Sequence, residues 1–313
     1  MNKRKITALA TVAGGVLSAV YIGVSQYFLN MTFGKDPKKR PHGGSSSLAE
    51  SAKEGREWLH AHDHHIVTMR NSEGLLLRAH YIPCENAKRT LIEFHGWHGS
   101  WDVDFSGSSP HLHEMGCNLL LVEQRAQGES QGKYMTFGLK ERYDLMEWVR
   151  WYQENIDADI PIYLVGLSMG ATTVLMASSE TFPQEVKGII ADCGFTSPYD
   201  IIKKVSKQWF HLPEHPFMDS SRFYTKKRLG IDTKSWSTID AVSHATVPIL
   251  FIHGKEDHFV PYEMTVKAYE ACTSEKDILL VDGARHGVSF IVDQEAYVEK
   301  VTLFFSKYDE KQK

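Results

Sequence analysis

The sequence predicts a doubly wound α/β fold with a mostly parallel sheet and an inserted helical cap, preceded by an N-terminal transmembrane helix. Short β-branched apolar runs alternate with longer amphipathic stretches, and residues 196–246 interrupt this alternation. Residues 6–29 form a separate run without a charge. Continuous apolar strands separated by helices are typical of a parallel sheet that is covered on both faces.

The predicted strands begin with a hairpin. Two strand-like runs, His65–Arg70 and Leu75–Ile82, flank the turn sequence Asn-Ser-Glu-Gly. Six later apolar runs predict further strands, at Thr90–Phe94, Cys117–Val122, Ile162–Val165, Gly188–Ala191, Pro248–Ile252 and Asp277–Val281. Helical stretches such as Leu139–Tyr152 and Tyr262–Ala271 lie between them. The alternation predicts a single α/β domain over residues 48–313.

Residues 196–246 are basic and aromatic and contain no strand-like run. A loop of this length without secondary structure is uncommon inside a compact domain. We therefore expect an inserted helical cap over these residues, with most of its aromatic side chains burying the cap on the body.

The N-terminal segment has the composition of a membrane anchor. The uncharged run of 24 residues at 6–29 would, as a helix, reach roughly the 30 Å of a bilayer core. It follows a short basic tail, residues 1–5, and precedes a basic Gly/Pro/Ser-rich tether, residues 30–47. A cleaved signal peptide is the alternative, but signal-peptide apolar regions run only about 7–15 residues. The tighter basic cluster before the run favours a single-pass protein of the cell membrane with its folded domain outside the cytoplasm.

The charge distribution argues against a nucleic-acid partner. The chain has 35 Lys and Arg, 39 Asp and Glu, and a net charge of −4. Residues 1–40 contain seven Lys and Arg and one Asp, so this segment carries +6 and the remainder −10. Nucleic-acid binding requires basic side chains clustered on the folded surface, and here the folded domain is acidic.

A candidate nucleophile lies between a strand and an Ala-rich helix. Gly166-Leu-Ser168-Met-Gly170 matches GxSxG, in which the glycines allow a sharp strand-to-helix turn that projects the serine hydroxyl. A second copy, Gly128-Glu-Ser130-Gln-Gly132, follows a polar stretch and opens no clear helix. The context selects Ser168 and rejects Ser130.

Two later loops supply the groups that a serine nucleophile needs. A serine hydroxyl requires a base, and the base requires an orienting group. His286 follows the last predicted strand and Asp257 follows the strand before it, so the chain order is serine, acid, base. Asp192, at the end of an earlier strand, is the alternative acid.

The oxyanion hole is expected from two backbone N–H groups. One belongs to Met169, directly after the nucleophile, and the other to Trp97, in the loop after the strand Thr90–Phe94. Two such donors stabilise the negative oxygen that develops in acyl transfer.

No cofactor or metal site is predicted. The four cysteines are widely spaced and contain no CxxC pair, at Cys84, Cys117, Cys193 and Cys272. The run His60-Ala-His-Asp-His-His65 resembles a metallo-hydrolase ligand motif, but its aspartate is one position early, which favours a solvated turn. Phosphate-binding glycine motifs are absent from the sequence.

Taken together, these motifs resemble the α/β-hydrolase superfamily over residues 58–306, with its membrane-anchored bacterial serine-aminopeptidase-like (S33-type) branch as the nearest resemblance. The resemblance rests on the GxSxG of Ser168, His95-Gly-Trp97, His253-Gly-x-x-Asp257 and Gly283-x-x-His286. The chain departs from the family at Glu123-Gln-Arg-Ala-Gln-Gly128, where Asp-x-Arg-Gly-His-Gly is common; this loop is structural, so the triad residues are unaffected.

The resemblance implies a serine hydrolase. We expect cleavage of a carboxylic ester, or a related small-molecule acyl compound, through an acyl-serine intermediate on Ser168. The alternatives are a peptidase or amidase of the serine-aminopeptidase type, and a catalytically silent anchored binding module. The motifs do not encode the substrate, because the cap side chains that face Ser168 determine it.

Overall fold

The computed structural model describes residues 15, 20–35, 53–156 and 159–309. Eight strands form one sheet: β1 (His65–Arg70), β2 (Leu76–Ile82), β3 (Arg89–Phe94), β4 (Cys117–Glu123), β5 (Ile162–Leu167), β6 (Val186–Asp192), β7 (Ile249–Gly254) and β8 (Lys276–Val281). Their order is β1-β2-β4-β3-β5-β6-β7-β8. Among the strands of the described residues, β2 pairs in antiparallel fashion with β1 and with β4, and the remaining pairs are parallel. The predicted hairpin and mostly parallel sheet are confirmed, and the strand ends differ from the predicted ends by at most two residues.

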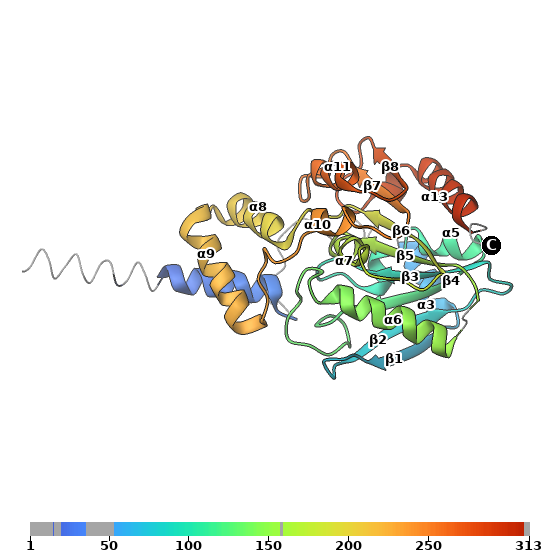
Figure 1. Cartoon of the computed structure of the whole chain (residues 1–313), viewed down its shortest axis with the longest axis horizontal. Helices are drawn as coiled ribbons and strands as arrows, with labels where there is room; N and C mark the ends of the chain where they lie inside the picture. Colours follow the sequence, from blue (N-terminus) through green and yellow to red (C-terminus); the bar gives the residue numbers. More distant parts are fainter. Residues whose placement is uncertain (1–14, 16–19, 36–52, 157–158, 310–313) are drawn as a thin grey trace, which may run out of the picture.

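Helices cover both faces of the sheet (Figure 1). One face is packed by α6 (Glu141–Asn155), α7 (Met169–Ala177), α10 (Thr238–Val242) and α11 (Tyr262–Ala271). The other is packed by α3 (Lys53–Ala61), α4 (Trp101–Asp104), α5 (Ser109–Glu114) and α13 (Gln294–Tyr308), beside the short α12 (Ser289–Val292). Strands β3, β4 and β5 are buried along their whole length, which explains their continuous apolar sequence.

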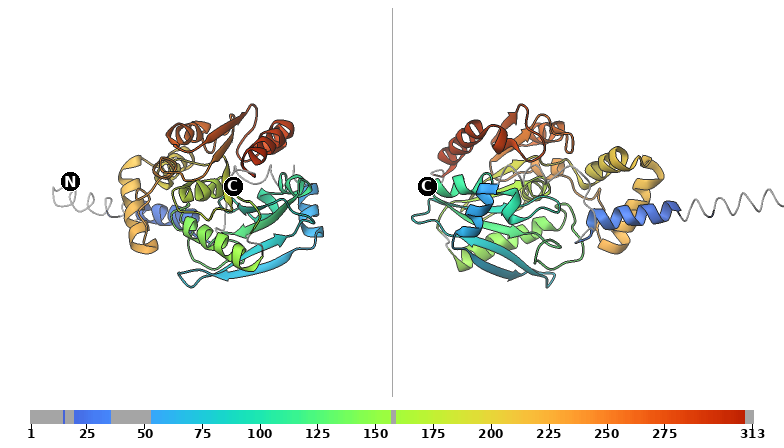
Figure 2. Two further views of the ribbon diagram at one scale, coloured as in Figure 1. Left: turned by 45° about the vertical axis from the view of Figure 1, so that its right-hand side comes forward. Right: turned by 180° about the vertical axis from the view of Figure 1, so that it is seen from behind.

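The cap consists of α8 (Pro198–Phe210), α9 (Glu214–Tyr224) and a π-helical turn η1 (Thr225–Leu229). It extends away from the sheet, on the side opposite the C-terminal end (Figures 1 and 2). The predicted cap, residues 196–246, is helical, but it extends beyond the cap helices, which end at Leu229. Helix α10 belongs to the body instead, because Ala241 and Val242 are fully buried there and Val242 joins the core beneath α7.

An N-terminal helix, residues 20–33, lies beside α9 of the cap (Figures 1 and 2). Phe28, Leu29 and Phe33 are almost completely buried. The Phe28 ring meets Phe210 and Phe217 edge to face, at centroid distances of 4.8 and 4.9 Å. Residues 34 and 134 then form a β-bridge. This helix is therefore part of the folded domain.

These packing contacts correct the predicted N-terminal organisation. Residues 20–29, predicted as the end of a transmembrane anchor, pack against the cap, and residues 30–33, predicted as tether, continue the same helix. Of the helices in the described ranges, none is both long enough and apolar enough to cross a membrane. Residues 1–14 and 16–19, which hold the basic tail and most of the predicted anchor, lie outside the described residues, as does the tether from residue 36.

Replacing Phe33 tests whether the N-terminal helix is integral to the fold. Because the Phe33 side chain is fully buried, Phe33→Ala should lower the free energy of unfolding by about 3–5 kcal/mol. Tyr27 lies on the same helix and is 55% exposed, so Tyr27→Ala is the matched control and should change stability little. Urea unfolding of both variants makes the comparison, and equal stability would show that the helix is not packed as described.

A carboxyl group is buried in the middle of the sheet. Glu93 of β3 is fully buried, and its Oε2 accepts a hydrogen bond of 2.6 Å from Ser109 Oγ. Burial raises the pKa of Glu93 to about 8, against an ordinary value of 4.5. Between these two pH values the folded protein retains a proton that the unfolded chain releases.

Stability should therefore fall as the pH rises from about 4.5 to about 8. We expect Glu93→Gln to remove this part of the pH dependence, since the amide is neutral throughout and its oxygen still accepts from Ser109. Glu154→Gln, at an exposed position of α6, should leave the dependence as in the wild type. Urea unfolding of both variants at pH 5, 6.5 and 8 tests this prediction. If the free energy of unfolding of Glu93→Gln falls with pH as steeply as that of the wild type, Glu93 is not the group responsible.

Candidate active site

Ser168 occupies a sharp turn between β5 and α7. Its backbone φ is +56°, a left-handed conformation that is uncommon for a residue other than glycine. The backbone around the turn is packed so closely that side chains are excluded on either side of the serine. A Cβ on Gly170 would lie 1.6 Å from the carbonyl oxygen of Phe94, and one on Gly166 would lie 2.3 Å from that of Gly170. Both glycines of the predicted motif are therefore sterically required.

The structure brings together Ser168, His286 and Asp257 from three different loops. His286 Nε2 lies 2.9 Å from Ser168 Oγ, and His286 Nδ1 lies 2.6 Å from Asp257 Oδ2. Since a carboxylate can only accept, the Nδ1–H donates to Asp257, which leaves Nε2 free to accept from the serine hydroxyl. The residues meet because the carboxyl ends of β5, β7 and β8 lie along one edge of the sheet.

Asp257 is held as a carboxylate. Its Oδ1 accepts the backbone N–H groups of Phe259 and Val260, both at 2.8 Å. Burial by itself raises the pKa of Asp257, but the neighbouring His286 and His253 outweigh this effect and hold that pKa well below its usual range. His253 Nε2 lies 3.0 Å from Asp257 Oδ2, a contact that the sequence did not identify.

The alternative acid, Asp192, has a different environment. Its Oδ1 accepts a hydrogen bond of 3.0 Å from Ser289 Oγ. Burial raises the pKa of Asp192 to about 6. Asp257, rather than Asp192, is the carboxylate that is hydrogen-bonded to His286.

The loop that carries Trp97 is braced from two sides. The backbone N–H of Gly96 donates to Asp104 Oδ2 at 2.6 Å. From the other side, the Trp97 indole N–H donates to the carbonyl oxygen of Thr32 at 2.8 Å. The end of the N-terminal helix therefore supports the loop that is predicted to supply an oxyanion-hole donor. Met169, the other predicted donor, begins α7.

A narrow apolar cavity of about 20 Å³ opens beside Ser168. By volume it has room for roughly one water molecule. It is bounded by the N-terminal helix, α8 and the segments that follow β3, β4, β6 and β7. Its lining residues besides Ser168 are Phe28, Met31, Thr32, Trp97, Phe137, Phe195, Ile201, Ile202, Val205, Phe259 and Val260. Helix α8 of the cap thus borders the site through Ile201, Ile202 and Val205.

Three of these residues, Phe28, Met31 and Thr32, were missed by the sequence analysis because they lie in or next to the uncharged run. Buried positions of this segment, 25, 28, 29, 32 and 33, recur with the spacing of one face of a helix. The opposite face is also apolar, with Val24 and Tyr27 exposed, so no polar face distinguished this helix from a membrane span.

The other motifs have separate contacts. Ser130 Oγ donates to the carbonyl oxygen of Glu123 at 2.6 Å and accepts from the backbone N–H of Arg78 at 2.9 Å, so it braces a loop. His60 Nε2 lies 2.9 Å from Asp102 Oδ2, near the start of the body.

One buried thiol was not expected near the site. Potential ligand atoms of Cys193, Asp257 and His286 all lie within 4.8 Å of one another. Burial raises the pKa of the Cys193 thiol well above its usual range, so the group stays protonated. A metal would need the thiolate and would have to break the hydrogen bond between His286 and Asp257, and these residues therefore do not favour a metal site.

Comparisons with known proteins agree with this architecture. A family model described as the alpha/beta hydrolase fold matches residues 89–216. The uncharacterized protein YqkD of Bacillus subtilis is 24% identical over 240 residues, which cover 76% of this chain and 77% of that protein. Human alpha/beta hydrolase domain-containing protein 17B is also 24% identical, over 76% of this chain and 74% of its own length.

Solved structures share the fold at low sequence identity. The esterase Pf2001 of Pyrococcus furiosus has a TM-score of 0.64 at 22% identity, over 86% of this chain and 99% of that one. The acylaminoacyl peptidase of Pyrococcus horikoshii has a TM-score of 0.61 at 15% identity, over 80% of this chain and 42% of that one. The membrane-anchored serine-aminopeptidase-like branch stays a prediction. The family match across residues 89–216, the strand order of the sheet and the solved structures agree that this chain has the alpha/beta hydrolase fold.

Proposed function

We propose that this protein is a serine hydrolase that cleaves a small-molecule carboxylic ester with an apolar acyl group. The observation that carries the proposal is the hydrogen-bonded chain from Ser168 through His286 to Asp257, which ends at an apolar cavity. Such a chain activates a hydroxyl that is otherwise a poor nucleophile.

In the proposed mechanism Ser168 Oγ attacks the ester carbonyl carbon while its proton passes to His286 Nε2. Asp257 stabilises the resulting imidazolium through the Nδ1–H hydrogen bond. His286 then returns the proton to the leaving alcohol, and an acyl-serine remains. Water, deprotonated by the same imidazole, attacks this acyl group. The bond between the acyl carbon and Ser168 Oγ then breaks as His286 returns the proton to Oγ, which releases the carboxylic acid.

The negative oxygen of each tetrahedral intermediate is assigned to the backbone N–H groups of Met169 and Trp97. Met169 stands at the first position of α7, where the helix N-terminus favours negative charge. Trp97 lines the same cavity as Ser168, and its loop is braced by Asp104 and Thr32. Preorganised donors of this kind typically contribute about 2.7–4 kcal/mol each to transition-state stabilisation.

The cavity lining favours an ester over the substrate of an aminopeptidase. Its twelve lining residues include no Asp or Glu that could hold the ammonium group of a peptide N-terminus. Among the structural neighbours, one is an esterase and another an acylaminoacyl peptidase, so the fold alone does not distinguish the two reactions. Amide hydrolysis is the second candidate on that ground.

Labelling by a fluorophosphonate separates the enzyme from a silent binding module. Wild-type protein should label covalently and Ser168→Ala should not, because the reagent traps an activated serine.

For hydrolysis of p-nitrophenyl acetate, Asp257→Asn should lower kcat by about 10³–10⁴-fold, since the imidazole loses its orienting carboxylate. Asp192→Asn is the control and should stay within tenfold of wild type. The reverse pattern would assign the acid role to Asp192, and equal labelling of Ser168→Ala would remove the enzyme assignment.

Enlarging the cavity should change the acyl-chain preference. Phe28 is 1% exposed and forms one wall of the cavity beside Ser168. We expect Phe28→Ala to shift the maximum of kcat/KM along a series of p-nitrophenyl esters towards longer acyl chains. For an ester with one or two added methylene groups, kcat/KM should rise by up to about tenfold. Tyr27→Ala removes a neighbouring aromatic ring that points to solvent, and should leave the chain-length profile unchanged. An unchanged profile in Phe28→Ala would show that the acyl group lies elsewhere.

A further inference from the structure

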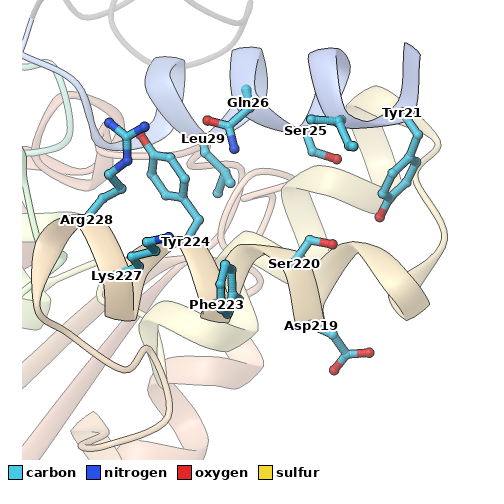
Figure 3. A pocket seen from close by; sticks show the side chains of 11 residues that line it. Tyr21, Ser25, Gln26, Leu29, Asp219, Ser220, Phe223, Tyr224, Lys227 and Arg228 are labelled. Carbon is cyan, nitrogen blue, oxygen red and sulfur yellow. The ribbon is translucent and has the colours of Figure 1, made fainter. Parts of the chain in front are cut away.

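A second and larger cavity, of about 530 Å³, lies between the N-terminal helix and the cap. Side chains from both walls project into it in Figure 3, among them Tyr21, Ser25 and Leu29 from the N-terminal helix and Phe223 from α9. We call this cavity the cap groove. Leu29 lines it while the adjacent Phe28 lines the cavity at Ser168, so one helix separates the two spaces.

Two hydroxyl groups at the cap groove have no hydrogen-bond partner among the described residues. Ser25 is 4% exposed, and its Oγ is buried without a partner. The hydroxyl oxygen of Tyr21 is also buried without a hydrogen-bond partner. A buried hydroxyl without a hydrogen bond costs about 1–3 kcal/mol. Both oxygens are unsatisfied polar atoms in the wall of the groove, and a ligand reaches them only when the side chains over them move.

The rim of the cap groove is positively charged. Lys227 and Arg228 line it and are exposed, and within the described part of the chain neither makes an ion pair. The neighbouring Lys226 differs, because its ammonium lies 2.8 Å from Asp232. Asp219, the acidic residue of the lining, accepts a hydrogen bond from His215 at 2.8 Å. The unpaired charges at the groove are cationic, which favours an anionic ligand.

The remaining lining is apolar and open to solvent. Ile22 is 58% exposed and Phe223 is 67% exposed, and the buried Leu29 also lines the groove. Exposed large apolar side chains that line a cavity are typical of a site that binds an apolar group. The cap groove thus combines an alkyl-binding wall with a cationic rim.

We propose that the cap groove binds a single-chain amphiphile with an anionic phosphate or carboxylate head group. The head group lies against Lys227 and Arg228 at one end of the groove, whereas Ser25 and Tyr21 stand towards the other end (Figure 3). The alkyl chain lies along Ile22, Leu29 and Phe223. The site is separate from Ser168, so it holds or fails independently of the proposed hydrolysis.

Binding of octyl phosphate to the full chain tests this proposal. Titration calorimetry is done on Ser168→Ala protein in a fixed concentration of non-ionic detergent, so that partitioning is the same for every variant. We expect saturable binding that weakens at least tenfold when K227E and R228E are combined. Lys207→Glu makes the same kind of charge change at an exposed position of α8, and affinity should stay within twofold.

A second variant, Ser25→Leu, keeps the charges and fills the groove, and it should also weaken binding at least tenfold. Circular dichroism and the melting temperature check that each variant is folded. Equal affinity in K227E/R228E and Lys207→Glu would overturn the proposal, as would equal binding of octyltrimethylammonium. Inorganic phosphate that displaces octyl phosphate at equal concentration would show a simple anion site and would also overturn it.

Discussion

The left-handed backbone conformation of Ser168 is the constraint around which the site is built. The flanking glycines leave no room for a Cβ, because Gly166 lies against the backbone of α7 and Gly170 against the backbone at the end of β3. The second of these contacts places the backbone of Gly170 against the carbonyl oxygen of Phe94. The nucleophile turn and the loop that follows β3 are thus positioned by one packing contact.

The proposed base, His286, and the proposed acid, Asp257, reach this turn through the order of the sheet. Parallel strands end at the same edge, so the loops after β7 and β8 deliver Asp257 and His286 to the serine. The acid is itself fixed, since two backbone N–H groups and His253 surround its carboxylate. An imidazole that is hydrogen-bonded at Nδ1 to such a carboxylate has one orientation and one tautomer, which is the arrangement that proton transfer from serine needs.

The N-terminal helix connects the cap with this machinery. Its last turn accepts a hydrogen bond from the Trp97 indole, and its buried face supplies Phe28 and Met31 to the cavity at Ser168. On the neighbouring face the same helix lines the cap groove. A segment that precedes the sheet in the chain therefore forms a wall between two cavities and braces the loop beside the nucleophile.

The sequence predicted the sheet, most of its helices, and the candidates Ser168, His286 and Asp257, with Asp192 as the alternative acid, because strand-forming runs and short motifs depend on local steric requirements. It did not separate Asp257 from Asp192, since both follow strands, and only the distance to His286 distinguishes them. It also assigned residues 20–35 to an anchor and tether. Burial of Phe28 and Phe33 depends on partners more than a hundred residues away, Phe217 and Phe137 respectively, and an apolar helix has the same composition whether it packs against a cap or against lipid. Tertiary packing alone decided that difference.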